Sequence, residues 1–187
     1  MLPKLHVVIA STRPGRAGLP IATWFFDAAK RHGGFDVALV DLVEIGLPLL
    51  DEKSHPRLQK YEHEHTKRWS AIVDAADAFV FVTPEYNFSA APSLLNALDY
   101  LYREWSYKPA GFVSYGGISG GMRSVMMAKQ LVTSLKMMPL PEAVTITSFS
   151  QQLKDGVFTA SDANEKSTKE MLNELVRWSA ALKTMRA

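Results

Sequence analysis

Five short apolar segments alternate along this chain with longer segments in which apolar residues recur at helical spacing. The apolar segments, each expected to form a strand, span residues 5–10, 35–42, 79–82, 110–115 and 143–147. The expected helices span residues 19–32, 58–75, 93–105 and 119–137, followed by a last helix capped by Ser161 or Asp162. Unbroken apolar runs are typical of strands buried on both faces. Strands that alternate with helices predict a parallel sheet covered on both faces by right-handed crossovers.

This alternation predicts the α/β class, with a three-layer, doubly wound, five-stranded parallel sheet. We expect the flavodoxin-like strand order 2-1-3-4-5, one of the two common orders of such sheets. The 187 residues contain no repeat, low-complexity tract or linker. A chain of this length is typical of one domain, so residues 1–187 are predicted to form a single domain.

Composition and charge exclude several kinds of protein. The chain has no cysteine, which rules out disulfides, thiolate catalysis and cysteine-ligated metal sites. A net charge of +2 is too balanced to indicate a nucleic-acid partner. No apolar run reaches the length of about 18 residues that a membrane helix needs. Because the N-terminus leads directly into a strand, we see no signal peptide and expect a cytoplasmic protein without a membrane partner.

A basic loop, residues 11–18, follows the first expected strand and opens the first helix. Unpaired backbone N–H groups and the positive end of the helix dipole favour a phosphate at such a position. The guanidinium groups of Arg13 and Arg16 match phosphate oxygens. Since the loop lacks both the dinucleotide and the Walker patterns, it favours a monophosphate. A solvated basic turn is the alternative interpretation.

A polar and aromatic turn, residues 84–89, joins the third expected strand to the next helix. Open parallel sheets hold ligands at the carboxyl ends of their strands. The turn offers a carboxylate, two aromatic rings and an amide, which suit the face and rim of a flat heterocycle. The alternative is that Tyr86 and Phe88 only pack against neighbouring loops.

A glycine-rich turn, residues 114–121, follows the fourth expected strand. Four glycines in six residues let the backbone approach a ligand closely and present N–H groups to it. A strained crossover would need only one or two of them, so ligand binding is the better interpretation. Three such turns at one edge of the sheet indicate a cofactor site.

His63 and His65, with acidic neighbours, resemble a metal site at first sight. In a helix, however, side chains two positions apart do not face each other. We therefore interpret this segment as a solvated helix face and predict no metal site.

These motifs together resemble those of the NADPH-dependent FMN reductase family, the flavodoxin-like quinone, azo-dye and chromate reductases. The resemblance covers about three quarters of the chain. It is carried by the three turns and by Asn96-Ala97-Leu98-Asp99. One departure is Leu95, where members often carry lysine, which bears on subunit contact more than on flavin binding.

The resemblance implies three groups of FMN-binding residues. The expected phosphate ligands are Ser11, Arg13, Arg16, Ala17 and Gly18. The residues expected against the isoalloxazine and ribityl chain, largely through backbone groups, are Pro84, Glu85, Tyr86, Asn87 and Phe88. The residues expected at the pyrimidine side are Ser114, Tyr115, Gly116 and Gly117.

The resemblance also implies the reaction. Hydride passes from NADPH or NADH through bound FMN to a small acceptor: a quinone, an azo compound, a metal oxyanion or free flavin. The flavin carries the chemistry, so no catalytic side chain is expected, and one shared pocket predicts ping-pong kinetics. A homodimer or homotetramer is expected. The alternatives are a non-enzymatic electron carrier of the flavodoxin type, which is usually strongly acidic, and a flavin-free binding domain.

Overall fold

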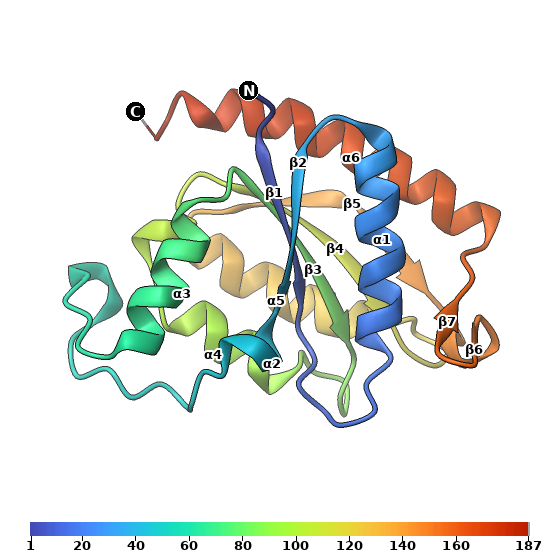
Figure 1. Cartoon of the computed structure of the whole chain (residues 1–187), viewed down its shortest axis with the longest axis horizontal. Coiled ribbons are helices and arrows are strands. Elements are labelled where there is room, and N and C mark those ends of the chain that lie inside the picture. The colour runs from blue at the N-terminus through green and yellow to red at the C-terminus, as the bar shows by residue number, and fades with distance from the viewer. Residues whose placement is uncertain (187) are drawn as a thin grey trace.

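The computed structural model describes residues 1–186, whose centre is a parallel sheet with the order β2-β1-β3-β4-β5 (Figure 1). Its strands are β1 (Lys4–Ile9), β2 (Asp36–Asp41), β3 (Ala78–Pro84), β4 (Pro109–Tyr115) and β5 (Met138–Ile146). Every pair of neighbouring strands runs parallel. The predicted α/β class and flavodoxin-like strand order are confirmed.

Helices cover both faces of the sheet, as Figure 1 shows. One face carries α1 (Gly18–His32) and α6 (Asp162–Lys183), and the other carries α3 (Glu64–Asp74), α4 (Pro92–Asp99) and α5 (Met122–Ser134). The strands β3 and β4 are buried along their whole length, because each is covered on both faces. Two apolar cores result, one on each side of the sheet.

The helix predicted over residues 58–75 begins only at Glu64, so its predicted start is wrong. The cause is a buried carboxylate far along the chain. Glu104 accepts hydrogen bonds from Gln59 Nε2 at 3.2 Å, Tyr61 Oη at 2.8 Å and Ser70 Oγ at 2.7 Å. The bonds from Gln59 and Tyr61 tie the segment before α3 to this carboxylate, and Glu52 accepts the backbone N–H groups of Glu62 and His63, so the helix begins only at Glu64.

The same carboxylate shortens the next helix, which was predicted to reach residue 105 but ends at Asp99. Glu104 accepts the backbone N–H of Tyr102 at 3.3 Å, and a separate 3-10 turn follows at Arg103–Trp105. Helix α5 begins three residues later than predicted, because Gly120 and Gly121 have positive φ angles. The chain also contains a short helix α2 (Leu42–Ile45), which the sequence pattern did not indicate.

The last strand, β5, begins five residues earlier than the predicted start at residue 143. It contains Pro139 and Pro141, which an edge strand tolerates because one of its sides has no neighbouring strand. Beyond it, a small hairpin is formed by β6 (Leu153–Lys154) and β7 (Val157–Phe158). Ser161 and Asp162 were the two predicted caps of α6. Ser161 is the cap, in a reciprocal capping box with Asn164.

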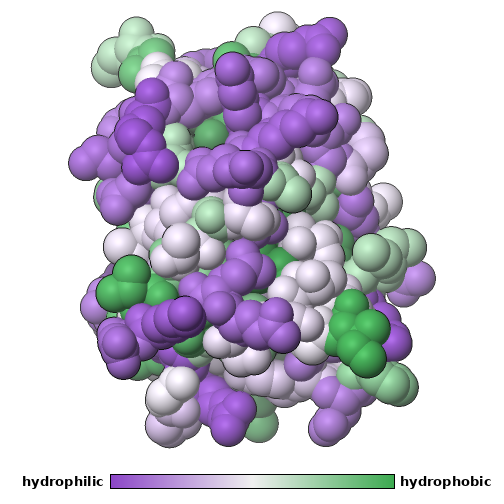
Figure 2. All heavy atoms as spheres, turned by 90° about the vertical axis from the view of Figure 1, so that its right-hand side faces the viewer, coloured by the Kyte–Doolittle hydropathy of each residue, from purple (hydrophilic) through white to green (hydrophobic). Residues whose placement is uncertain are grey.

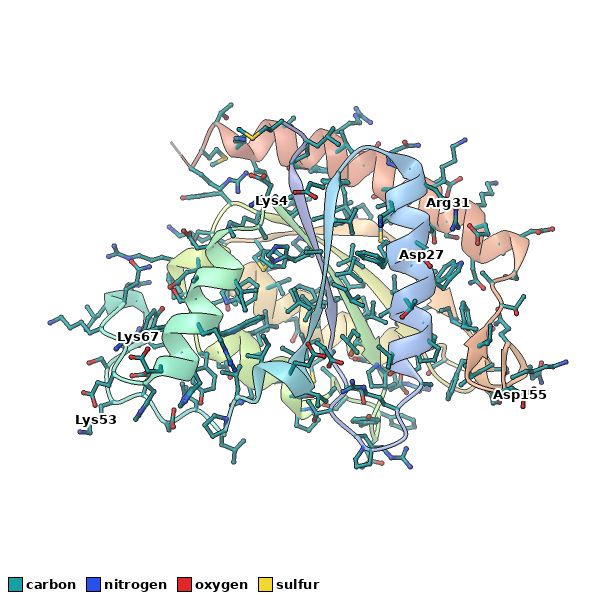
Figure 3. The ribbon with its side chains drawn as sticks, viewed as in Figure 1. Lys4, Asp27, Arg31, Lys53, Lys67 and Asp155 are labelled. Carbon is teal, nitrogen blue, oxygen red and sulfur yellow. The ribbon has the colours of Figure 1, made fainter. Side chains whose placement is uncertain are left out.

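One face of the molecule is mainly polar. On the face with α1, α6 and the hairpin, hydrophilic side chains dominate and apolar ones are scattered (Figure 2). Charged side chains such as Lys53, Lys67 and Asp155 project outward (Figure 3). Within residues 1–186, none of the helices combines the length and the apolar character needed to cross a membrane.

Candidate functional site

The three predicted turns meet at the carboxyl edge of the sheet, because β1, β3 and β4 are neighbours. We call residues 11–17 the phosphate loop, residues 86–89 the aromatic turn and residues 116–121 the glycine loop. Ser11 Oγ and Tyr86 Oη are 2.6 Å apart, which joins the phosphate loop to the aromatic turn. Ser119 Oγ donates to Glu85 Oε2 at 2.9 Å, which joins the glycine loop to the start of the aromatic turn.

The phosphate loop leads into an uncapped helix end. Ala17 is the N-cap residue of α1, no side chain caps the helix, and its first turn contains no acidic residue. The side chain of Arg13 is exposed and makes no ion pair with the residues that the structure describes. An uncapped helix N-terminus beside a free guanidinium is an arrangement that favours an anion.

Arg16 is held more tightly than Arg13. Its guanidinium donates to Ser11 O at 3.1 Å and forms an ion pair with Asp41, the last residue of β2. Asp41 also accepts the backbone N–H of Val43 and so caps α2. Only 14% of the Arg16 side chain and 10% of the Asp41 side chain are exposed. Arg16 therefore connects the phosphate loop to α2, a link that the sequence pattern did not reveal.

Ser11 is fully buried, so its hydroxyl shapes the loop from inside. In addition to its contact with Tyr86, the Ser11 hydroxyl accepts a hydrogen bond from the backbone N–H of Arg13 at 3.4 Å. Ser93 Oγ on α4 donates to Ala10 O and holds the loop from the other side. The exposed parts of the phosphate loop are Thr12, Arg13, Pro14 and Gly15.

The aromatic turn has an unusual backbone. Asn87 and Phe88 have φ angles of 50° and 66°, and the turn is closed by Tyr86 N to Ser89 O at 3.0 Å and Ser89 N to Tyr86 O at 2.9 Å. Two consecutive left-handed residues that are not glycine are costly, and such conformations cluster at functional sites. The ring of Phe88 is 71% exposed, so packing in the core does not account for it.

Glu85 connects the aromatic turn to the start of α5. Its carboxylate accepts the backbone N–H of Arg123 at 3.1 Å and Arg123 Nη1 at 2.6 Å, in addition to Ser119 Oγ. Burial works against its ionisation. The hydrogen bonds from Arg123 and Ser119 outweigh that effect and hold the pKa of Glu85 below its usual range.

The four glycines of the glycine loop have different reasons for being glycine. A Cβ on Gly116 would lie 2.9 Å from the backbone of Gly121, while Gly120 and Gly121 have positive φ angles. Gly117 has an ordinary φ, and a Cβ there would meet nothing within 4 Å. Folding alone therefore explains three of the glycines, and Gly117 borders open space at the site.

Tyr115 points away from the glycine loop and lies under α1. Its ring packs edge-on against Phe149, and its hydroxyl would lie 2.8 Å from a Cβ on Gly18. This hydroxyl is buried near Ser11 without a hydrogen bond of normal geometry, and Ser114 Oγ is also buried without a partner. Burial raises the pKa of Tyr115, so its hydroxyl stays protonated and can donate.

A cleft of about 540 Å³ opens beside the phosphate loop. Its lining carries no charged side chain and consists of Thr12, Leu42, Val43, Gly46, Leu47, Pro48, Leu49, Pro92, Ser93 and Asn96. Asn96 holds one wall, since its Nδ2 donates to Pro48 O at 2.7 Å and its Oδ1 accepts Leu50 N at 3.0 Å. The segment 44–55 carries no recognisable motif in the sequence, and its residues 46–49 form one boundary of the cleft.

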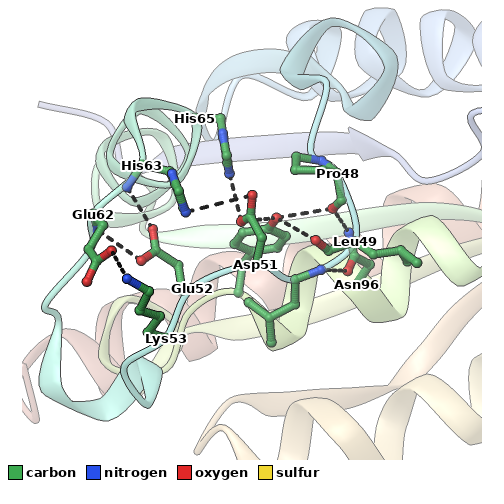
Figure 4. A network of polar contacts seen from close by, with 11 residues as sticks. Pro48, Leu49, Asp51, Glu52, Lys53, Glu62, His63, His65 and Asn96 are labelled. Carbon is green, nitrogen blue, oxygen red and sulfur yellow. Dashed lines mark hydrogen bonds and ion pairs between the residues drawn. The ribbon is translucent and has the colours of Figure 1, made fainter.

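The neighbouring network corrects the analysis of the two histidines (Figure 4). His63 precedes α3 in an extended conformation, so its ring stacks on that of His65 with centroids 5.1 Å apart. His65 Nε2 lies 3.0 Å and His63 Nε2 lies 3.9 Å from the carboxylate of Asp51. The argument that these side chains point apart was wrong, because it assumed a helix at both positions. Within residues 1–186, no group of three or more acidic or histidine side chains could hold a metal ion.

The residues at the sheet edge fit FMN in charge and shape. The uncapped α1 and Arg13 suit a phosphate monoester, and the buried Tyr115 hydroxyl lies unpartnered beneath the same helix end. The aromatic turn offers an exposed ring, while Gly117 leaves space for a close approach. The exposed residues of the phosphate loop, 12–15, include no acidic side chain.

The chain is similar to known proteins over most of its length. Residues 3–151 match the family model described as NADPH-dependent FMN reductase. An NAD(P)H-dependent FMN reductase of Schizosaccharomyces pombe is 40% identical over 157 residues, which cover 83% of this chain and 78% of the relative. An NADPH:quinone oxidoreductase of Arabidopsis thaliana is 36% identical over 114 residues, 54% of this chain and 58% of the relative.

The fold is also similar to that of a solved flavoenzyme. FerB from Paracoccus denitrificans, an NAD(P)H:(acceptor) oxidoreductase, superimposes with a TM-score of 0.77 at 20% identity. The similarity covers 96% of this chain and 98% of FerB. With the family model spanning most of its residues, the chain belongs to the NADPH-dependent FMN reductase family.

Proposed function

We propose that the phosphate loop, the aromatic turn and the glycine loop hold the FMN of this FMN-dependent NAD(P)H oxidoreductase. The observation that carries the assignment is the uncapped N-terminus of α1 beside Arg13, which makes no ion pair within residues 1–186. Both lie at the edge where the other two loops meet. The enzyme activity follows from the family, so the electron-carrier and flavin-free alternatives are set aside.

Bound FMN supplies the hydride chemistry, and the residues of this chain bind the flavin and orient it. Arg13 would pair with the phosphate, and the first N–H groups of α1 would donate hydrogen bonds to it. Arg16, paired with Asp41, fixes the shape of the loop that presents them. The backbone of the glycine loop can donate N–H groups to the ring at Gly117, where no side chain intervenes. No protein nucleophile is required, which agrees with the absence of cysteine.

We propose an uncharged organic acceptor, with a quinone as its class. The cleft beside the phosphate loop supports this choice, because its lining is mainly apolar and carries no charged side chain. A metal oxyanion would have no cation there to replace its hydration. The name of the Arabidopsis relative, an NADPH:quinone oxidoreductase, supports the same class.

Steady-state kinetics test this assignment. NADPH or NADH is varied against a benzoquinone, an azo dye and chromate. If donor and acceptor occupy the same opening one after the other, the double-reciprocal plots should be parallel. The value of kcat/KM should be highest for the quinone. Intersecting lines would contradict the shared opening, and a preference for chromate would contradict an uncharged acceptor.

We further propose that the protein is a homo-oligomer, a dimer or a tetramer. Apolar side chains next to the site support this: Phe88, Met126 and Met127 are 71%, 62% and 41% exposed. Ser89 Oγ lies 3.0 Å from Met127 Sδ, so the aromatic turn and α5 form one continuous surface. Sedimentation velocity measures the state, and a monomer at micromolar concentration would refute the proposal.

A further inference from the structure

We propose that Arg123 is a positioning residue for the ring end of the flavin site, because it holds the aromatic turn in place. The inference rests on the proposed function, which places FMN against this turn. Arg123 lies in the first turn of α5, 35 positions after Phe88 in the chain (123 − 88 = 35). Its contacts with Glu85 and Phe88 carry the argument.

The aromatic turn needs support from outside. Its two left-handed residues are not glycine, and only two backbone hydrogen bonds close it. A conformation of this kind persists only when the surrounding structure holds it. Ser11 holds the turn at Tyr86, and the remaining support comes from α5 and the glycine loop.

Glu85 provides the first half of the support. Its side chain is only 8% exposed, and its carboxylate accepts three hydrogen bonds, two of them from Arg123. The carboxylate thereby also occupies the N-terminus of α5, where a negative charge is favoured. The residue just before the turn is thus fixed to α5.

The ring of Phe88 provides the second half. The guanidinium of Arg123 lies over this ring, with 4.0 Å between the guanidinium carbon and the ring centroid. One Arg123 side chain therefore binds a carboxylate through its nitrogen atoms and an aromatic ring through its face. Of the two basic side chains that stay charged, arginine and lysine, only arginine has a planar cation that can stack on the ring while its N–H groups pair with the carboxylate, so lysine does not reproduce this arrangement.

A different role for Arg123 would be to attract the phosphate groups of NADPH. Half of its side chain is exposed, so solvent reaches it. Against that role, Glu85 neutralises the guanidinium at 2.6 Å and already occupies the helix N-terminus. The two roles differ in what lysine can do, because lysine keeps the charge and loses the planar stack.

The test compares Arg123→Lys and Arg123→Ala with a matched control, Arg177→Ala. Arg177 pairs with Glu174 at 2.5 Å on the exposed side of α6, away from the sheet edge. Two quantities are measured for each protein. The first is amide hydrogen exchange at Tyr86 and Ser89 in the flavin-free protein, read by NMR. The second is the dissociation constant of FMN, read by quenching of flavin fluorescence.

We expect both Arg123 variants to exchange at these two amides about tenfold faster and to bind FMN about tenfold more weakly, with Arg177→Ala unchanged. Unchanged exchange in Arg123→Ala would overturn the proposal, and so would faster exchange with unchanged FMN affinity. It would also be overturned if Arg123→Lys resembled wild type in both measurements, because lysine keeps the charge and loses the planar stack.

A wild-type protein that bound no FMN would refute the proposed function instead. The exchange rates would then still decide whether Arg123 holds the turn. The two failures are therefore distinguishable.

Discussion

The hydroxyl groups of Ser11 and Tyr86 lie 2.6 Å apart, although 75 positions separate the two residues in the chain. This contact joins the phosphate loop after β1 to the aromatic turn after β3. Because Ser11 is fully buried, its hydroxyl has no water to replace a lost partner. The contact therefore couples the two ends of the proposed FMN site.

Tyr86→Phe should weaken FMN binding about three- to tenfold, the effect of removing one neutral hydrogen bond of about 1 kcal/mol. Fluorescence quenching measures the dissociation constant. Tyr107→Phe is the control, since the Tyr107 hydroxyl makes no hydrogen bond with the residues that the structure describes. Equal affinities in the two variants would show that the Ser11–Tyr86 contact does not shape the site.

Arg13→Ala should weaken the binding of FMN by at least tenfold and leave the binding of riboflavin nearly unchanged. The reason is that a charge-assisted bond to phosphate contributes about 1.5–3 kcal/mol, and riboflavin lacks the phosphate. Titration of both flavins into the same protein gives the comparison. An equal loss for the two ligands would refute a phosphate role for Arg13.

Arg16→Ala should destabilise the protein itself, by about 2 kcal/mol even without flavin. It leaves the carboxylate of Asp41 unpaired and largely buried, which is costly. Urea unfolding of the flavin-free protein measures the loss. Asp41→Asn should lower the free energy of unfolding less in the Arg16→Ala background than in the wild-type protein. Additive losses would argue against a direct interaction between the two residues.

The glycine loop offers a matched pair of variants. Gly121→Ala should lower the free energy of unfolding by more than 1 kcal/mol, because its φ is 83° and a Cβ would lie 2.9 Å from Tyr115 N. Gly117→Ala should leave stability within about 0.5 kcal/mol, since its Cβ meets open space. Gly117→Ala should nevertheless weaken FMN binding, because its Cβ would enter the open space proposed for the flavin. Normal affinity in that variant would place the flavin away from Gly117.

Acid should destabilise the fold partly through His6. Burial, aided by the charges of Lys108 and Lys4, lowers the pKa of His6 from 6.5 to about 4. Between these values the unfolded chain binds a proton that the folded chain excludes, so stability falls as the pH falls from about 6.5 towards 4. From pH 7 to pH 5 this contribution is about 2 kcal/mol. Urea unfolding at both pH values measures this. Between pH 7 and pH 5, His6→Leu should lose about 2 kcal/mol less of its free energy of unfolding than the wild type. An equal loss in the two proteins would contradict the argument.

The strands could be predicted from the sequence, because apolar runs such as that of β3 signal burial on both faces. The ends of α3 and α4 could not, since the carboxylate of Glu104 holds residues 59–61 and 102 outside both helices. The three turns of the site were identified from their composition. Two partners were missed: Asp41, 25 positions from Arg16, and Arg123, 38 positions from Glu85. Asp41 lies at the carboxyl end of a parallel strand, and this position could have indicated that it belongs to the site. Nothing in the sequence around Arg123 indicated its contact with Glu85.

The most direct test of the central claim is anaerobic reduction of the FMN-loaded protein by NADPH. The protein is mixed with FMN, freed of excess flavin and followed by its visible absorption. The account predicts one FMN retained per chain and rapid bleaching on addition of NADPH, with the yellow colour restored by a quinone. Colourless protein, or bound flavin that stays oxidised with both NADPH and NADH, would contradict it.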